Sequence, residues 1–382
     1  MTELGNLISL ARNEKCGDNK YPVLSMTMHQ GLVLQSDKFK KTIASKDRSE
    51  YKVVRRGQLV VSFPIDEGVL AAQRIVDAGI VSPAYNIWNI DQDAILPHFL
   101  EYALRCDRAI EYYKSRLRGS TARRRSLPKE SFLQFEIPVP SISEQQHILH
   151  VLQTMEDILR MQKQQLESLD TLIKARFVEM FGDPVRNSRG WKTSQLSEFI
   201  LFLTSGSRGW SQYFTDEGEY FITIKNVKNC KITLNEVQHV NPPKNMEAIR
   251  TRVKEHDLLI SITADLGRTG IVTRDIEEHG AYINEHLTCI RLDTQKVNPV
   301  YVAWFLESEG GKRQFSAKNQ SAVKAGLNFN AINSLELAVP PLLLQDRFAA
   351  FVSEVDKSKA VVQKALEKTQ LLRASLMQQY FS

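Results

Sequence analysis

The residues with the clearest resemblance to a catalytic motif are at 241–244, which read Asn-Pro-Pro-Lys. In adenine methyltransferases an Asn-Pro-Pro-aromatic sequence holds the target amino group, and the aromatic ring stacks on the flipped base. Lys244 stands where that ring is required, and no Gly-x-Gly follows a strand-like segment at a suitable position to hold the cofactor. The sequence therefore favours a turn over a methyl-transfer site at residues 241–243.

Other catalytic and metal-binding patterns are incomplete. Residues 310–312 read Gly-Gly-Lys, but Arg313 follows where a nucleotide-binding loop needs Ser or Thr to hold magnesium. The histidines are scattered singly, without a His-Glu-x-x-His pair. Asp265 and Glu285 are isolated acids, which favours structural roles over nuclease ligation. We therefore expect no catalytic residue, no metal site and no cofactor in this chain.

Cysteine spacing and hydropathy indicate the compartment. Cys16, Cys106, Cys230 and Cys289 lie far apart, which is typical of reduced thiols rather than of a disulfide framework or a metal site. No apolar run approaches the roughly 20 residues of a membrane span, and no signal-peptide pattern follows Met1. We expect a cytoplasmic protein.

Basic residues are concentrated in two segments of the chain. Residues 105–129 contain nine Lys or Arg residues against two acidic ones, and residues 310–335 contain four basic residues and no acidic one. The whole chain carries a net charge of +6. Two separated basic segments suit a protein that neutralises phosphates at two places, although a basic run is also common on an ordinary solvated surface.

The chain repeats itself at an offset of 200 residues. Residues 137–140 read Ile-Pro-Val-Pro and precede Gln145, while residues 338–340 read Ala-Val-Pro and precede Gln345. The offset then holds without a gap to the C-terminus, where Phe181 matches Phe381. Upstream the match is looser: residues 21–25 match residues 220–224, and residues 58–62 match residues 257–261. These upstream segments are β-rich runs bounded by polar residues.

Each copy of the shared segment carries the heptad pattern of a long helix. Seam residues recur at alternating steps of four and three, which places them along one side of a helix. Ser143 is the expected N-cap, and Gly182 with Pro184 suits the end of the first helix. Each helix should span about 38 residues, or roughly 57 Å. The first seam consists of Ile148, Leu152, Met155, Leu159, Gln162, Leu166, Leu169, Ile173, Arg176 and Met180.

Two helices of equal length that each need to bury a seam predict an antiparallel pair. The alternative is that each helix covers its own globular domain. We predict an α+β protein with two α/β globular domains, joined by two long helices packed as an antiparallel coiled coil in a pseudo-two-fold repeat. Such an object matches the two-fold symmetry of duplex DNA, and its helices would set the gap between two half-sites. The predicted domains are residues 1–140, 141–183 (central helix), 184–340 and 341–382 (C-terminal helix).

The arrangement resembles a known family. Residues 137–145, together with residues 176–184 at the end of the first helix, are similar to the central region of the specificity subunits of type I restriction–modification enzymes. Residues 205–208 before residues 220–222 resemble the opening of a target-recognition domain. Residues 79–85 and 284–287 resemble later positions of two such domains. The resemblance covers nearly the whole chain, and its strength comes from the order of the segments together.

The resemblance implies a non-catalytic DNA-sequence-recognition subunit. Such a subunit binds a bipartite, gapped site in double-stranded DNA, with one half-site per recognition domain. Its helices dock two methylation subunits, which transfer a methyl group from S-adenosylmethionine to adenine N6, and fix the spacer length. Motor-nuclease subunits join through them and cleave unmethylated DNA using ATP and Mg. No membrane association is implied.

Polar and basic residues in loops are the candidates for DNA contact, because Arg forks bind phosphate or guanine and Asn or Gln pairs with adenine. Thr27, His29 and Trp210 are weaker candidates, and Trp210 is more typical of packing. The first-domain set is Arg116, Arg118, Ser120, Arg123, Arg124 and Arg125. The second-domain set is Lys318, Asn319, Gln320, Ser321, Lys324, Ser207, Arg208, Lys225 and Asn226.

Two other functions stay open at this stage. An N6-adenine DNA methyltransferase would have to bind S-adenosylmethionine by itself, which the altered motif at residues 241–244 argues against. A coiled-coil adaptor that binds only proteins would lack salt-sensitive DNA binding, which the two basic segments argue against.

Overall fold

The fold is described from a computed structural model of residues 1–382, in which residues 29, 39–46, 119–125 and 320–325 lie outside the described part. The chain divides into two compact units. The first unit contains residues 1–164 and 363–382, and the second unit contains residues 165–362. The boundary falls inside both long helices, so each unit holds part of each helix. The boundaries of the four predicted segments remain predictions.

Each unit contains a four-stranded antiparallel sheet with the same strand order. In the first unit the order is β2 (Ile8–Leu10), β9 (Asn86–Ile90), β6 (Leu59–Val61) and β7 (Leu70–Ala72). In the second unit it is β12 (Ile200–Ser205), β21 (Leu287–Leu292), β18 (Leu258–Ser261) and β19 (Thr269–Ile271). Strands β6 and β18 are buried along their whole length, which explains why their sequences are continuous apolar runs.

Corresponding helices follow each sheet. The first unit has α2 (Pro97–Arg105), α3 (Asp107–Arg116) and α4 (Lys129–Leu133). The second has α8 (Pro299–Glu307), α9 (Glu309–Lys318) and α10 (Phe329–Asn333). Proline opens both α2 and α8, where its missing N–H costs nothing. A short antiparallel pair then closes each unit: β1 (Thr2–Glu3) with β10 (Glu136–Ile137), and β11 (Thr193–Gln195) with β22 (Glu336–Ala338).

The remaining strands form smaller sheets. In the first unit β3 (Leu24–Thr27) pairs with β4 (Gly31–Leu34), β5 (Lys52–Arg55) pairs with β8 (Ala78–Val81), and α1 (Gln35–Lys38) follows β4. In the second unit the order is β13 (Phe214–Thr215), β17 (Gln238–Val240), β14 (Glu219–Ile222) and β20 (Ala281–Ile283). The second unit also holds β15 (Val227–Lys228) with β16 (Lys231–Ile232), and the helices α6 (Met246–Thr251) and α7 (Arg274–His279).

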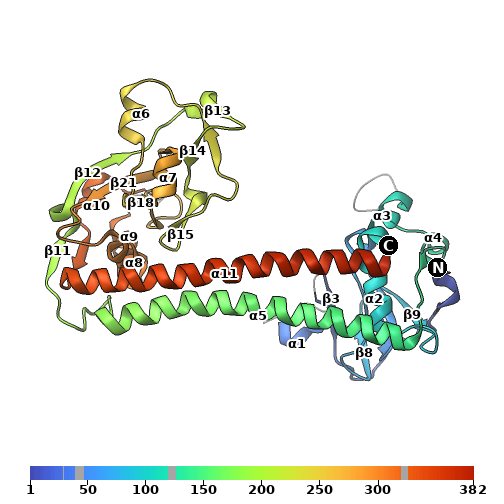
Figure 1. The fold of residues 1–382 in the computed structure, drawn as a ribbon. Coiled ribbons are helices and arrows are strands. Elements are labelled where there is room, and N and C mark those ends of the chain that lie inside the picture. The colour runs from blue at the N-terminus through green and yellow to red at the C-terminus, as the bar shows by residue number, and fades with distance from the viewer. Residues whose placement is uncertain (29, 39–46, 119–125, 320–325) are drawn as a thin grey trace. The chain divides into compact units, whose positions relative to one another are not determined.

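The long helices α5 (Ile142–Phe181) and α11 (Leu342–Phe381) each contain 40 residues and pack side by side (Figure 1). In the first unit Glu156 pairs with Arg373 at 3.2 Å. In the second unit Asp170 pairs with Lys359. The partner's number falls as the number on α5 rises, so the pair is antiparallel. None of the predicted seam residues on α5 is exposed, which confirms the α+β class and the packing of the long helices.

Both long helices contribute to the core of each unit. In the first unit Leu152 of α5 and Phe381 of α11 are buried, and the Phe381 ring lies 5.1 Å from that of Phe99 on α2. In the second unit Phe177 of α5 and Phe348 of α11 are buried with ring centroids 5.4 Å apart. The pattern accounts for the aromatic residues that recur at the helix ends.

The start of α5 differs from the prediction. Glu144 donates its backbone N–H to the Ser141 hydroxyl at 3.3 Å, and the helix begins at Ile142. The prediction of Ser143 as N-cap was therefore wrong by two residues. The predicted end was right: α5 stops at Phe181, and Gly182 adopts a left-handed φ of 83° that terminates the helix.

A buried glutamine fastens the start of each long helix to its unit. The Gln145 side chain accepts a hydrogen bond from the Leu96 backbone N–H at 2.8 Å and donates to the carbonyls of Ala94 and Pro140. Gln345 accepts from the Asn298 backbone N–H at 2.9 Å and donates to the Pro340 carbonyl. Both side chains are fully buried. The glutamine that recurs in the sequence therefore connects the start of each long helix to the rest of its unit by hydrogen bonds.

We expect Gln145→Ala to destabilise the first unit by about 2–3 kcal/mol, because it leaves the buried Leu96 N–H and two carbonyls without partners. Thermal unfolding measures this loss. Gln146→Ala is the matched control, since the neighbouring glutamine is exposed and should change stability by less than about 0.5 kcal/mol. Equal losses of stability for the two substitutions would contradict a stabilising role of the Gln145 hydrogen bonds.

Candidate nucleic-acid interface

Loops that are distant in sequence meet at one edge of the large sheet in the second unit. Glu285, which follows β20, donates its backbone N–H to the Ser207 carbonyl at 3.0 Å. Ile262, which follows β18, donates to the His286 carbonyl at 3.0 Å and accepts from the Leu327 N–H at 2.9 Å. The loops at 206–209, 262–268, 284–286 and 326–327 therefore form one cluster. We call it the loop edge.

Arg208 is the most exposed basic side chain of the loop edge, at 83%. Its Nε atom lies 3.7 Å from Oε1 of Glu285, whose side chain is mostly buried. The backbone beneath is fixed, because Ser207 is 1% exposed and its hydroxyl lies 3.1 Å from that of Thr251. Arg208 therefore combines an exposed side chain with a backbone that is held in place, which is what an arginine that contacts DNA needs.

The neighbouring loop at 262–268 is tightly folded. The Thr263 hydroxyl lies 2.8 Å from Nδ1 of His286, and Ala264 adopts a left-handed φ of 56°. Such a conformation is costly for a residue with a Cβ and is concentrated at functional loops. Arg268 in the same loop is bound to Asp265 through both Nε and Nη2, so most of its fork is already occupied.

The structure separates the other second-domain candidates into exposed and buried ones. Lys225 is exposed and lies in the 3-10 helix Ile224–Asn226. Asn226 is buried. Its side-chain oxygen accepts hydrogen bonds from the backbone N–H and the hydroxyl of Thr223, and its side-chain nitrogen donates to the Thr233 carbonyl. Ser207 is likewise buried. The expectation that Ser207 and Asn226 present side chains in exposed loops was wrong, and both instead hold the backbone in place.

The basic loop of the second unit is described only at its ends. Lys318 donates to the Ser334 hydroxyl at 2.9 Å. Asn319 is exposed and accepts from the Gly326 N–H at 3.1 Å, and Gly326 forms a bridge with Thr263 of the loop edge. The two described ends of the basic loop, Asn319 and Gly326, therefore lie beside the loop edge. Three further candidates lie outside the described residues: Gln320, Ser321 and Lys324.

The first unit has a corresponding basic loop, again described only at its ends. Arg118 and Ser126 form a two-bond antiparallel bridge with N–O distances of 3.0 Å. Arg116 ends α3 and stacks over the Tyr112 ring at 4.8 Å. Both arginines are exposed. Ser120, Arg123, Arg124, Arg125 and, from an earlier loop, His29 lie outside the described residues.

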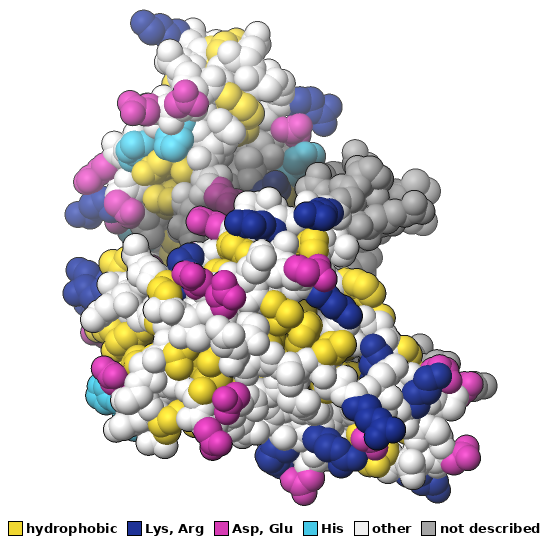
Figure 2. Space-filling model, turned by 90° about the vertical axis from the view of Figure 1, so that its right-hand side faces the viewer, with side chains coloured by type: hydrophobic (Ala, Val, Ile, Leu, Met, Phe, Trp, Pro, Cys, Tyr) yellow, Lys and Arg dark blue, Asp and Glu magenta, His cyan; other side chains and the backbone are white. Residues whose placement is uncertain are grey.

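The weaker candidates have local structural roles. The Thr27 hydroxyl accepts from the Gln30 N–H and donates to the Gly31 carbonyl, which closes the turn after β3. Trp210 is buried and stacks on Phe221 at 5.7 Å, which confirms its interpretation as a packing residue. On the face shown in Figure 2, Lys and Arg side chains are interspersed with acidic and hydrophobic ones.

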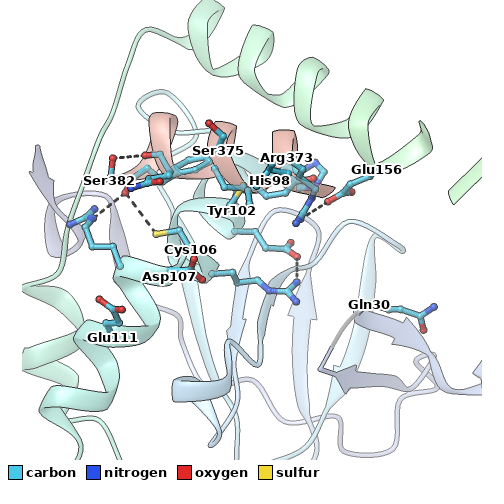
Figure 3. A pocket seen from close by; sticks show the side chains of 18 of the residues that line it. Gln30, His98, Tyr102, Cys106, Asp107, Glu111, Glu156, Arg373, Ser375 and Ser382 are labelled. Carbon is cyan, nitrogen blue, oxygen red and sulfur yellow. Dashed lines mark hydrogen bonds and ion pairs between the residues drawn. The ribbon is translucent and has the colours of Figure 1, made fainter. Parts of the chain in front are cut away.

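A cavity of about 1040 Å³ lies in the first unit, between α2, α3 and the C-terminal part of α11 (Figure 3). Burial, with the positive charge of Arg74 as a second cause, lowers the pKa of His98 to about 4. Burial raises the pKa of Glu101, although Arg74, the Ala72 N–H and Arg105 oppose the effect. Glu101 accepts from the Ala72 N–H and pairs with Arg105, so it holds α2 against β7.

His98 predicts acid sensitivity of the first unit. A histidine with a lowered folded pKa is neutral in the folded state, whereas the unfolded chain takes up a proton between pH about 6.5 and about 4. Its contribution to stability is therefore present above pH 6.5 and is lost as the pH falls toward 4. We expect His98→Asn to reduce the drop in Tm between pH 7 and pH 5 relative to the unsubstituted chain. An unchanged drop would show that the pKa of His98 is the same in the folded and unfolded states.

The second unit has a cavity of about 730 Å³ at the corresponding place, between the α8–α9 corner and the C-terminal part of α5. Phe177 and Val178 line it from α5, and Ser308 lines it from the corner. Among the described residues no group of three or more His, Cys, Asp or Glu side chains is placed to hold a metal ion. No described helix is long and apolar enough to cross a membrane.

Comparison with known proteins relates the chain to a family of DNA specificity subunits. Residues 3–171 match the family model for the type I restriction modification DNA specificity domain. A Methanocaldococcus jannaschii protein assigned as the type I restriction enzyme MjaX specificity subunit is 21% identical over 75% of this chain and 68% of its own length. The MjaIX specificity subunit of the same organism is 28% identical over 36% of this chain and 35% of its own. The chain is therefore similar to the specificity subunits of type I restriction–modification systems.

Solved structures share the fold of this chain. A chain from a study of complex assembly and conformational transition of the type I system aligns over 100% of this chain and 96% of its own, with 17% identity and a TM-score of 0.60. The specificity subunit from M. genitalium aligns over 100% of this chain and 95% of its own, with 14% identity and a TM-score of 0.55. Specificity subunits are the non-catalytic, DNA-recognising component of type I enzymes.

Proposed function

We propose that this chain is a specificity subunit and that it binds a bipartite, gapped site in double-stranded DNA, with one half-site for each recognition domain. The observation that carries the proposal is the structural repeat: the same sheet, the same three helices and a basic loop at the same place occur in both units. The two copies carry different loop residues, Arg118 in one and Asn319 in the other. Each copy therefore offers different hydrogen-bonding groups to base edges.

The proposed contacts fall into two classes. Exposed cations such as Arg116 and Lys225 neutralise phosphates and fix the register. The loop-edge residue Arg208, the exposed Asn319 and the candidates outside the described residues supply base contacts. The recognition domains correspond to residues 1–140 and 184–340, and the two long helices fix the spacer.

We further propose that each unit docks one adenine-N6 methylation subunit on its part of the helix pair. In the first unit Met161 and Leu372 are exposed large hydrophobic side chains on α5 and α11. In the second unit Val361 and Leu172 are exposed at the positions 200 residues away. Each unit thus presents the same apolar pair, which suits two copies of one partner.

Heptad geometry places each apolar pair on a single surface. With the seam residue Leu159 at heptad position a, Met161 falls at position c, and the matching count on α11 places Leu372 at position g. Positions c and g lie on one flank of a helix, and antiparallel packing brings that flank of both helices to the same side. The motor-nuclease subunits join through the methylation subunits, which carry S-adenosylmethionine, while ATP and Mg belong to the motor.

Selection of randomised duplexes tests the DNA-binding proposal. The chain is co-purified with its methylation subunit, duplexes retained at moderate salt are amplified over several rounds, and the survivors are sequenced. We expect one motif of two short defined parts separated by a fixed gap, with retention that falls steeply as salt rises. A continuous motif, or retention without any motif, would contradict a bipartite reader.

The same purified components separate the two other candidate functions. A protein-only adaptor would show no salt-sensitive DNA retention when the methylation subunit is present. A methyltransferase would bind S-adenosylmethionine as an isolated chain in calorimetry, and we expect no heat of binding. Neither alternative is supported by a specific contact among the described residues.

A further inference from the structure

We propose that Arg208 reads a guanine in the half-site of the second recognition domain and that Glu285 positions it. This inference rests on the proposed DNA-binding function and assigns one base pair within it. Arg208 is the residue of the loop edge that combines high exposure with a fixed backbone and a charged neighbour that does not saturate its guanidinium.

The first step is the rigidity of the backbone on both sides of Arg208. The Ser207 N–H donates to the Ile283 carbonyl at 2.8 Å, and its carbonyl accepts the Glu285 N–H at 3.0 Å. On the other side Gly209 turns the chain with a φ of 73°, and the buried Trp210 ring fixes the next residue. The Cα of Arg208 is therefore held between two anchors.

The packing beneath Arg208 is equally close. A Cβ added to Gly206 would lie 2.1 Å from the Asn284 carbonyl oxygen and 2.2 Å from that of Ile283, both backbone atoms. Only glycine permits this approach, so the loop carrying Arg208 is pressed directly against the strand that leads to Glu285. The two residues are brought together by main-chain packing rather than by their own attraction.

The second step is the geometry of the guanidinium. The Arg208 nitrogen nearest to Glu285 is Nε, which lies 3.7 Å from Oε1, beyond hydrogen-bond length, and no hydrogen bond to a described residue engages the guanidinium. Guanine presents O6 and N7 in the major groove as a pair of acceptors that matches the two Nη groups, so a bidentate contact is available to an arginine held in this way. Arg268 differs, because Asp265 engages both its Nε and an Nη group.

The third step is that Glu285 is itself held. Its side chain is 29% exposed, and His286 beside it is fixed by the 2.8 Å contact with Thr263. The two units can be compared position by position through their large sheets. Leu59 pairs with Trp88 of β9 in the first unit, and the corresponding Leu258 pairs with Ile290 of β21 in the second, so Trp88 corresponds to Ile290. Glu285 lies as many residues before Ile290 as Pro83 lies before Trp88. The first unit therefore has Pro83, and no carboxylate, at the position of Glu285. The arginine–carboxylate device is specific to one domain.

The test compares the DNA motif of the wild-type complex with those of Arg208→Ala and Glu285→Gln, using the randomised-duplex selection. We expect Arg208→Ala to lower the preference for guanine about 10- to 100-fold at one position of one half-site and to leave the other half-site unchanged. We expect Glu285→Gln to lower the preference at that same position by a smaller factor, a position-specific effect that a purely structural residue would not produce.

The matched control is Arg274→Ala. Arg274 is another exposed arginine of the second unit, 73% exposed and paired with Glu255 at 3.4 Å, and its loss should leave the motif unchanged. Thermal melting confirms that each variant folds, as the exposure of Arg208 predicts. A wild-type motif whose guanines all persist in Arg208→Ala would overturn the inference and leave the bipartite function intact. Absence of any wild-type motif would overturn the function itself.

Discussion

Substituting Met161 and Leu372 together by Glu is expected to remove one methylation subunit from the complex. The two side chains form the exposed apolar pair of the first unit, and a carboxylate placed there would be desolvated without a partner on docking. Native mass spectrometry of the co-expressed complex should change from two methylation subunits per chain to one. The equivalent change at Leu172 and Val361 should have the same effect, and all four together should leave none.

Gln164→Glu with Gln370→Glu is the matched control for these variants. Both glutamines are exposed on the same helices, and neither belongs to the apolar pair. This control should retain two methylation subunits. If the control and the Met161 and Leu372 variant lost a subunit equally, charge alone would explain the effect and the docking surface would lie elsewhere.

Asp257→Ala is expected to unfold the second unit's large sheet at moderate temperature. Asp257 is fully buried and accepts from Arg291 through two bonds of 2.8 and 2.7 Å, and from the Lys254 N–H at 2.8 Å. Removing it leaves Arg291, whose side chain is 31% exposed, without its partner and the Lys254 N–H without its acceptor, which together cost about 3 kcal/mol. Thermal unfolding should show a Tm lower by about 10 °C, given roughly 2–4 °C per kcal/mol for a unit of this size.

Glu309→Ala provides the comparison for Asp257→Ala. Glu309 pairs with Arg313 at 3.1 Å, but both side chains are largely exposed, so the loss should be within about 1 kcal/mol. A stability loss for Asp257→Ala as small as that for Glu309→Ala would show that the buried pair contributes nothing to the sheet.

The long helices were predictable because their signal is local. A seam that recurs every three and four residues specifies a helix and its buried side without knowledge of the partner, and the 200-residue offset supplied the partner. The cap was predicted two residues late because Ser141 and Ser143 carry the same side chain. The hydrogen bond between Gln145 and the Leu96 N–H fixes the position of the helix start, so that Ser141 is the residue that caps it. Leu96 lies in another segment of the chain.

The candidate site was less predictable because exposure and pairing depend on contacts between distant segments. Ser207 and Asn226 have the composition of surface loop residues, yet the fold buries both. Glu285 was interpreted as an isolated acid, although the fold places it beside Arg208. A sequence signal was present at Gly206, which precedes both Ser207 and Arg208, but its meaning emerges only when the opposing carbonyls are known.

The most direct test of the account is the pattern of adenine methylation in cells. The chain is expressed with an adenine-N6 methylation subunit, and host DNA is sequenced by a single-molecule method that detects N6-methyladenine. The account predicts modified adenines on opposite strands within one motif of two defined parts and a fixed gap, present only when this chain is expressed. Methylation at a continuous motif, or methylation unchanged when this chain is omitted, would contradict it.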